Sequence, residues 1–313
     1  MKRKVAIVGA GHVGSHVASA LMLGDICEEI VLLDTDAGKA ECHAQDLQDA
    51  ACYAGKNTRV YAGSYQDIGD AQVCVLAYCG AIFEENRLEE LEVALDIADE
   101  ILPQLKASGF AGVLVGITNP CDLVAQYFAR KTGLPTVGTG TALDSARFRV
   151  RLAQQLAVQP ASVEGFCLGE HGDSQVPIFS QVRIGGLSLE QLAQQQPQRV
   201  SALDRQQVAR QTIEAGWHIV TGKGCTEFGI GSAAAELIGA IFADCGQVMM
   251  CSGPYRRSPN HPEIFTSIPR QVGSQGAQAA FLPVLTQEEQ AQFDASCALL
   301  EQYVQQRLDP RFA

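Results

Sequence analysis

The sequence predicts an α/β fold in which a doubly wound parallel sheet is followed by a mixed α+β domain. Up to about residue 140, short continuous apolar runs alternate with helix-like segments. Parallel strands that helices cover on both faces require apolar runs of this kind. Beyond that point, short β-type segments and long helices replace the alternation. A chain of 313 residues can bury two cores, so we predict domains 1–140 and 141–313, with the boundary near Gly140.

Strands and helices of the first predicted domain follow one another in strict alternation. The expected strands are Val5–Val8, Ile30–Leu33, Val73–Leu76 and Gly112–Gly116. The expected helices are Val13–Leu23, Lys39–Cys52 and Leu88–Ala107. Two parallel neighbouring strands must be joined by a long crossover, usually a helix. The helices expected between these strands therefore favour a parallel sheet.

The second predicted domain is less regular. It is expected to contain, in order, a helix at Ala142–Leu156, β-type segments around Val163–Leu168 and Ile178–Ile184, helices at Arg199–Ile219 and Gly231–Ala243, an irregular proline-rich segment at Ser252–Pro269 and a polar helix at Gln287–Arg307. This mixture is typical of an α+β domain.

Composition excludes several classes of partner. A net charge of -12 argues against nucleic acid and anionic membranes, because both bind basic surfaces. The apolar run near the N-terminus is interrupted by Gly9, Gly11 and His12, which leaves it too short for a secretion signal or a membrane span. The 11 cysteines include no Cys-x-x-Cys pair, which is typical of a reducing cytosol. We therefore expect a cytoplasmic protein.

A glycine-rich turn follows the first expected strand and opens the first expected helix. Gly9 allows the tight turn, Gly11 lets a pyrophosphate approach the backbone, and Gly14 allows close packing of helix on strand. Asp34 ends the second expected strand, 20 residues after Gly14, where a carboxylate can bind both ribose hydroxyls. This Rossmann-type pattern predicts a dinucleotide site, and because Asp34 repels a 2′-phosphate it favours NAD over NADP.

The turn and the start of the helix also carry two histidines and a valine. His12 and Val13 belong to the same predicted cofactor site, with His12 as an accessory contact. His16 is expected to be a surface side chain. A metal role for either histidine would need further ligands at suitable spacing, and none is evident, so we expect no metal.

Three further segments carry charged groups in apolar or glycine-rich surroundings. Asp144 and Arg147 lie at i, i+3 on one helix face, and His171 is flanked by glycines within Gly169–Asp173. Arg87 lies in a polar segment that follows a strand. Taken singly, these groups are consistent with a helical ion pair, a turn residue and a solvated cation. Together, behind a dinucleotide motif, they favour an acid–base site.

Five motifs give the sequence its resemblance to a known family, and the resemblance covers nearly the whole chain. They are Gly9-Ala-Gly-His-Val-Gly14, Thr118-Asn-Pro120, Gly138-Thr-Gly-Thr-Ala-Leu-Asp-Ser-Ala-Arg147, Gly169-Glu-His-Gly-Asp173 and Gly222-Lys-Gly-Cys-Thr226. In this order and spacing the chain resembles the L-lactate and malate dehydrogenases, including the L-2-hydroxyisocaproate branch.

The resemblance implies an NAD-dependent dehydrogenase that interconverts a small L-2-hydroxy acid and its 2-oxo acid. His171 would exchange the proton, with Asp144 fixing its tautomer. Arg147 would hold the substrate carboxylate by a bidentate fork. Arg87 would descend on a closing loop to polarise the substrate carbonyl and exclude water.

Two more positions match the family. Asn119, at the end of a strand, resembles the asparagine beside the nicotinamide and is assigned to both cofactor and substrate. Thr226 occupies a position that lines the substrate pocket. The resemblance also implies a homodimer or homotetramer.

The segment before Arg87 departs from the family pattern. Cys79–Arg87 is about two residues shorter than the usual substrate loop, and Ala94 stands where the family often has asparagine. Cys79–Asn86 contains no cation, whereas a dicarboxylate substrate would require one. We therefore expect a 2-oxo monocarboxylic acid as substrate. The alternatives are a malate dehydrogenase and an NAD-binding homologue that has lost catalysis.

Overall fold

A single mixed sheet forms the centre of the molecule. The computed structural model describes residues 2–80 and 87–312. Within these residues, nine strands pair in the order β14-β13-β12-β6-β5-β4-β1-β2-β3. Their bounds are β1 Lys4–Val8, β2 Glu29–Leu33, β3 Arg59–Ala62, β4 Val73–Leu76, β5 Val113–Gly116, β6 Thr136–Gly138, β12 Gln247–Tyr255, β13 Ile264–Gly273 and β14 Gly276–Ala280. Strands β1–β6 are parallel, and β12–β14 extend the sheet as antiparallel strands.

The order of the parallel strands confirms the doubly wound prediction. From β1 the chain passes to β2 and β3 on one side, then returns to β4, β5 and β6 on the other. The reversal lies between β1 and β4, which pair directly. In open sheets of this type, ligands bind at the carboxyl ends of the strands beside such a reversal. The glycine-rich turn after β1 therefore lies at the expected position.

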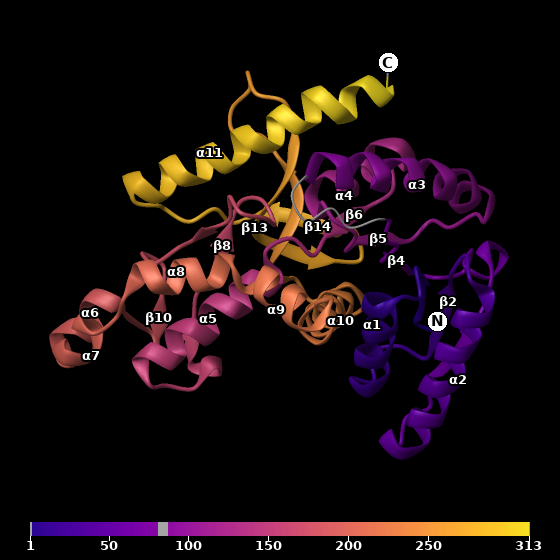
Figure 1. The fold of residues 1–313 in the computed structure, drawn as a ribbon, viewed down its shortest axis with the longest axis horizontal. Coiled ribbons are helices and arrows are strands. Elements are labelled where there is room, and N and C mark those ends of the chain that lie inside the picture. The colour runs from indigo at the N-terminus through magenta and orange to yellow at the C-terminus, as the bar shows by residue number, and fades with distance from the viewer. Residues whose placement is uncertain (1, 81–86, 313) are drawn as a thin grey trace.

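Helices cover both faces of this sheet (Figure 1). One face packs α1 (His12–Leu23), α2 (Ala37–Ala54) and α10 (Phe228–Ala243) over side chains such as Val5 and Ile7. The other face packs α3 (Arg87–Ala107), α4 (Cys121–Thr132) and α11 (Gln287–Tyr303) over Ala6 and Val8. Alternate residues of β1 thus enter separate cores, which explains why the strand is continuously apolar.

A third core lies beside the sheet, at the lower left of Figure 1. Its main side chains come from α5 (Ala142–Leu156), α6 (Leu189–Gln195) and α8 (Arg205–Ile213). The remaining short elements of this region are β7 Val163–Glu164, β8 Cys167–Leu168, β9 Val176–Pro177, β10 Arg183–Ile184, β11 Leu187–Ser188, α7 Pro197–Ser201 and α9 Ala215–Lys223. This core is formed entirely by the predicted second domain.

The expectation that Ser252–Pro269 is irregular holds only for residues 256–263 and is wrong for the residues on either side of them. These residues contribute to β12 and β13, which pair from Gln247–Val272 to Tyr255–Ile264. Pro254 lies beyond the single residue at which β12 pairs with β6, so its missing N–H breaks no bond there. The Pro269 carbonyl still accepts a hydrogen bond of 2.8 Å from the Phe281 N–H. Both prolines therefore occupy positions that a strand tolerates.

The single helix predicted at Arg199–Ile219 is also wrong. The chain instead forms α7, α8 and α9 in succession. Asp204 begins α8 as its N-cap, because its side chain accepts a hydrogen bond of 2.9 Å from the Gln207 N–H. A capping carboxylate of this kind ends the preceding turn and starts a new one.

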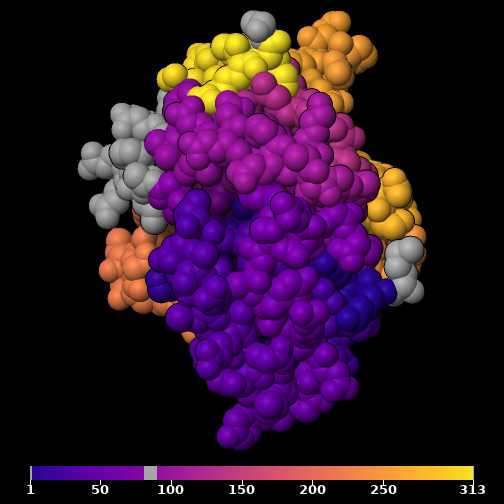
Figure 2. Space-filling view, turned by 90° about the vertical axis from the view of Figure 1, so that its right-hand side faces the viewer, coloured from indigo at the N-terminus to yellow at the C-terminus, as the bar shows by residue number. Residues whose placement is uncertain are grey.

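The two halves of the chain also occupy different parts of the outer surface. The first half of the chain forms most of the face shown in Figure 2, and the C-terminal residues, in yellow, lie at one end of it. Among residues 2–80 and 87–312, no helix is both long and apolar enough to cross a membrane.

Candidate active site

The glycine-rich turn leaves space for a ligand at one position only. Gly9 has a φ of +99°, and a Cβ on it would lie 2.5 Å from the Ala77 carbonyl oxygen at the end of β4. A Cβ on Gly14 would lie 1.9 Å from the Gly9 carbonyl oxygen. At Gly11, by contrast, a Cβ would meet nothing nearer than the Lys39 Nζ at 3.9 Å. Packing requires glycine at two positions, whereas Gly11 opens the backbone to a ligand.

Asp34 places a carboxylate directly beside this turn. Its Oδ2 accepts a hydrogen bond of 2.8 Å from the Ala10 N–H, and its Oδ1 accepts one of 3.0 Å from the Asp36 N–H. The turn and the end of β2 are thereby joined. The geometry fits a dinucleotide, since the open backbone at Gly11 and a carboxylate for ribose hydroxyls lie on the same edge of the sheet.

The other predicted cofactor contacts lie along the same edge. His12 is the first residue of α1 and is exposed, whereas the side chain of Val13 packs partly against the core. Asn119 is exposed after β5 and precedes Pro120 through a cis peptide bond. The neighbouring Thr118 hydroxyl hydrogen-bonds to the carbonyl oxygens of Leu76 and Tyr78, which fixes this segment to the end of β4.

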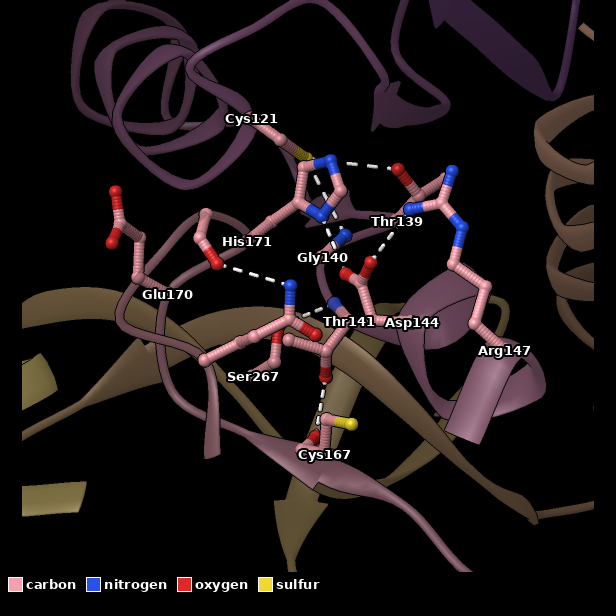
Figure 3. A network of polar contacts seen from close by, with 12 residues as sticks. Cys121, Thr139, Gly140, Thr141, Asp144, Arg147, Cys167, Glu170, His171 and Ser267 are labelled. Atoms are coloured by element: carbon pink, nitrogen blue, oxygen red, sulfur yellow. Dashed lines mark hydrogen bonds and ion pairs between the residues drawn. The ribbon is translucent and has the colours of Figure 1, made fainter. Parts of the chain in front are cut away.

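Three predicted residues form one cluster, drawn in Figure 3. The Asp144 carboxylate bonds to His171 Nδ1 at 2.6 Å through Oδ2 and to Arg147 at 2.9 Å through Oδ1. Asp144 is fully buried, while the side chains of His171 and Arg147 are 23% and 13% exposed. Burial acts to raise the pKa of Asp144, but His171 and Arg147 outweigh it and hold that pKa below its ordinary value.

Because Asp144 is ionised, the Nδ1 of His171 must donate the shared hydrogen bond. That fixes the imidazole as the Nδ1–H tautomer and leaves Nε2 as the ring nitrogen that can exchange a proton. The cluster therefore combines an imidazole that can transfer a proton, a carboxylate that orients it and a cation that can hold an anion.

Asp122, which the sequence reasoning missed, holds the backbone of His171 in place. Its Oδ2 accepts a hydrogen bond of 2.8 Å from the His171 N–H, and its Oδ1 bonds to the Ser252 hydroxyl. Burial raises the pKa of Asp122 to about 6, although both hydrogen bonds oppose this. One signal was available in the sequence, because Asp122 is a single acid in an otherwise apolar stretch of α4.

Gly216 of α9 was also missed. A Cβ there would lie 3.5 Å from an Arg147 guanidinium nitrogen, so α9 packs directly over that side chain.

Thr226 is half-buried in the segment between α9 and α10. Arg87 opens α3, but its side chain, like residues 81–86 before it, lies outside the described part of the structure.

A dinucleotide turn at a strand reversal, together with an oriented histidine and a largely buried arginine, defines the class of an α/β dinucleotide-dependent dehydrogenase. Residues 3–137 match the family description "lactate/malate dehydrogenase, NAD binding domain", and residues 141–309 match "lactate/malate dehydrogenase, alpha/beta C-terminal domain". The chain belongs to the lactate/malate dehydrogenase family, and its cofactor is NAD.

Individual relatives are similar over nearly their whole length. The chain is 33% identical to an L-lactate dehydrogenase of Fusobacterium nucleatum over 306 residues, covering 97% of this chain and 96% of that one. It is 37% identical to an L-lactate dehydrogenase of Thermus aquaticus over 302 residues, covering 95% and 97%. A ligand-bound structure of the minor L-lactate dehydrogenase from Enterococcus mundtii superimposes with a TM-score of 0.91 at 32% identity, covering 98% of each chain.

Asp34 is expected to set the choice between NADH and NADPH. In the parent, kcat/KM for NADH should exceed that for NADPH by about a hundredfold, which corresponds to about 3 kcal/mol of repulsion and lost hydrogen bonding. Asp34→Ala should reduce this ratio, as measured by steady-state kinetics with each cofactor. Asp36→Asn is the matched control, because it removes a neighbouring charge while keeping a side chain that can cap α2. Equal preference in the parent would refute the assignment.

Proposed function

We propose that this protein is an NAD-dependent L-2-hydroxy acid dehydrogenase of the L-lactate type, acting on a 2-oxo monocarboxylic acid and its alcohol. The observation that supports this most directly is the buried Asp144 carboxylate, which bonds to both His171 and Arg147. Oxidising a hydroxy acid requires a proton acceptor, a carboxylate clamp and a hydride acceptor, and NAD supplies the last of these when bound.

His171 is the proposed proton-transfer residue. In oxidation, its Nε2 accepts the substrate hydroxyl proton, and the positive charge that develops on the ring lies 2.6 Å from the Asp144 carboxylate. In reduction, the same nitrogen returns the proton to the carbonyl oxygen. Asp122 keeps the main chain at His171 in one position, so the ring retains its orientation.

Arg147 is the proposed carboxylate clamp. One of its nitrogens already bonds to Asp144, but a guanidinium has five N–H donors in a planar fork. The remaining donors suit a substrate carboxylate, and limited solvent exposure strengthens the interaction. Arg87 would polarise the carbonyl, Asn119 would contact both ligands, and Thr226 would line the pocket.

We place the functional division near Gly140, with residues 1–140 holding the cofactor and residues 141–313 holding the substrate. The ends of the two family matches support this division, although β12 pairs with β6 across it. We also propose a homodimer or homotetramer in the cytoplasm. Exposed apolar side chains at Phe228, Val248 and Val284 are of the kind that a second copy can cover, and light scattering would measure the assembly.

Substrate preference tests the proposal most directly. With NADH absorbance as readout, we expect pyruvate or a modestly larger aliphatic 2-oxo acid to give the highest kcat/KM, with 2-oxoisocaproate and phenylpyruvate as size probes. Oxaloacetate should be at least about tenfold poorer, because the sequence of Cys79–Asn86 contains acids and no cation that could pair with a second carboxylate. If oxaloacetate is the best substrate, the protein is a malate dehydrogenase. Absence of turnover with every acid, despite NADH binding, would favour the inactive homologue.

A further inference from the structure

Three potential metal ligands meet beside the cofactor turn, although two distant segments contribute them. His12 begins α1, whereas Cys225 and Glu227 lie just before α10. One ligand atom from each of the three side chains lies within 4.8 Å of the others. His12 Nδ1 is 3.3 Å from Glu227 Oε2, and Cys225 Sγ is 3.5 Å from the same oxygen.

These separations match the edges of a tetrahedral coordination shell. Zinc bonds nitrogen and oxygen at about 2.0–2.1 Å and sulfur at about 2.3 Å. At tetrahedral angles, these lengths place nitrogen and oxygen ligands about 3.3 Å apart and sulfur and oxygen ligands about 3.6 Å apart. Two of the three separations therefore already suit one ion, and the third, between His12 and Cys225, is at most 4.8 Å.

Neighbouring contacts hold the two segments together without an ion. The Lys223 ammonium pairs with Glu227 Oε1, while Oε2 faces His12 and Cys225 and also lies 3.6 Å from His16 Nδ1. His16 Nδ1 donates a hydrogen bond of 2.7 Å to the His12 carbonyl oxygen, and the His16 ring packs edge-on against Phe228 at 4.8 Å. Helices α1 and α10 pack closely along this contact. The cluster is thus preorganised by the fold.

We propose that His12, Cys225 and Glu227 bind a divalent cation of the Zn²⁺ type, and that the bound ion competes with NAD. Mixed thiolate, imidazole and carboxylate ligands favour zinc over magnesium or calcium, with water as the fourth ligand. Binding replaces the Cys225 S–H bond by a sulfur–metal bond and releases one proton to solvent.

Competition follows from the position of His12, and this part of the proposal rests on the assignment of the glycine-rich turn to the cofactor. His12 directly follows Gly11, where the backbone is open to the pyrophosphate. An ion bound to His12 would occupy the side chain of a predicted cofactor contact, one residue from that opening. Because the coupling is reciprocal, NADH must weaken metal binding by the factor by which the metal weakens NADH binding.

Metal binding is tested first with Co²⁺, whose bond to a thiolate absorbs in the near ultraviolet. Titration of the full chain should give this band with one ion per chain, and Zn²⁺ should remove it. Cys225→Ser should abolish the band, and Glu227→Gln should weaken Co²⁺ binding by about tenfold or more. Cys42→Ser, which removes an exposed cysteine on α2, should leave the band unchanged. A band that survives Cys225→Ser would overturn the site.

Competition is tested by NADH fluorescence with and without Zn²⁺. Zn²⁺ should raise the Kd for NADH of the parent by about tenfold or more. In Cys225→Ser, the same addition of Zn²⁺ should raise the Kd for NADH by less than about twofold. Metal binding at Cys225 with no change in NADH affinity would overturn the competition. A parent that binds no NADH even without metal would instead contradict the assignment of the cofactor turn, so the two failures are distinguishable.

Discussion

Replacing His171 with asparagine is expected to lower kcat by about a hundredfold to ten-thousandfold, the usual contribution of a general acid–base residue. The asparagine amide can still bond to Asp144, so the cluster should remain folded. It has no counterpart of Nε2, the proposed site of proton exchange. The Kd for NADH should stay within about twofold of the parent value, because the cofactor turn is a separate part of the structure.

Steady-state kinetics of 2-oxo acid reduction and NADH fluorescence measure these two quantities. His43→Asn is the control, because it makes the same change on α2, away from the cluster. A near-parental kcat for His171→Asn would show that another group transfers the proton. A matching loss in His43→Asn would show that the effect is not specific to the site.

Replacing Asp144 with asparagine should be nearly as damaging, with a fall in kcat of about a thousandfold or more. An amide of the same size can present its NH₂ group to His171 and so favour the wrong imidazole tautomer, an effect of about ten-thousandfold in the serine protease triad. It also removes the negative charge that offsets both the imidazolium and Arg147, which bonds to Asp144 at 2.9 Å. The KM for the 2-oxo acid should therefore change as well.

Thermal unfolding and circular dichroism of Asp144→Asn separate loss of chemistry from loss of fold. Because Asp144 is fully buried between two partners, some loss of stability is expected, but a cooperative transition should remain. Asp46→Asn, at an exposed carboxylate on α2, is the control for loss of charge alone. A folded Asp144→Asn with parental kcat would refute its role.

Local patterns predicted the elements whose signal is confined to a short stretch of chain. The alternation of apolar runs and helices up to residue 140 identified β1, β2, β4 and β5, and the spacing of Gly9, Gly11 and Gly14 identified the cofactor turn. Each pattern arises from neighbouring residues, because a strand buried on both faces is continuously apolar and a tight turn needs glycine.

Segments whose conformation depends on distant partners were predicted wrongly. Ser252–Pro269 contains prolines that suggest irregular structure, yet it pairs as β12 and β13 because β6, β14 and helices on both faces supply its neighbours. The helical spacing of apolar residues also did not predict the break at Asp204 between α7 and α8. Pairing and packing outweigh local propensity in β12 and β13, whereas the break at Asp204 has a local cause, the N-cap of α8.

The sequence by itself determined the doubly wound fold, the cofactor turn with Asp34, and the residue types needed for the proposed chemistry at Asp144, Arg147 and His171. Only the tertiary structure decided that Asp122 holds the main chain of His171, and that His12 meets Cys225 and Glu227. The physical reason is sequence separation. Asp122 and His171 are 49 positions apart, and His12 and Cys225 are more than 200 apart, so no periodic pattern in the sequence links them. Only the folded sheet and its packed helices bring them within bonding distance.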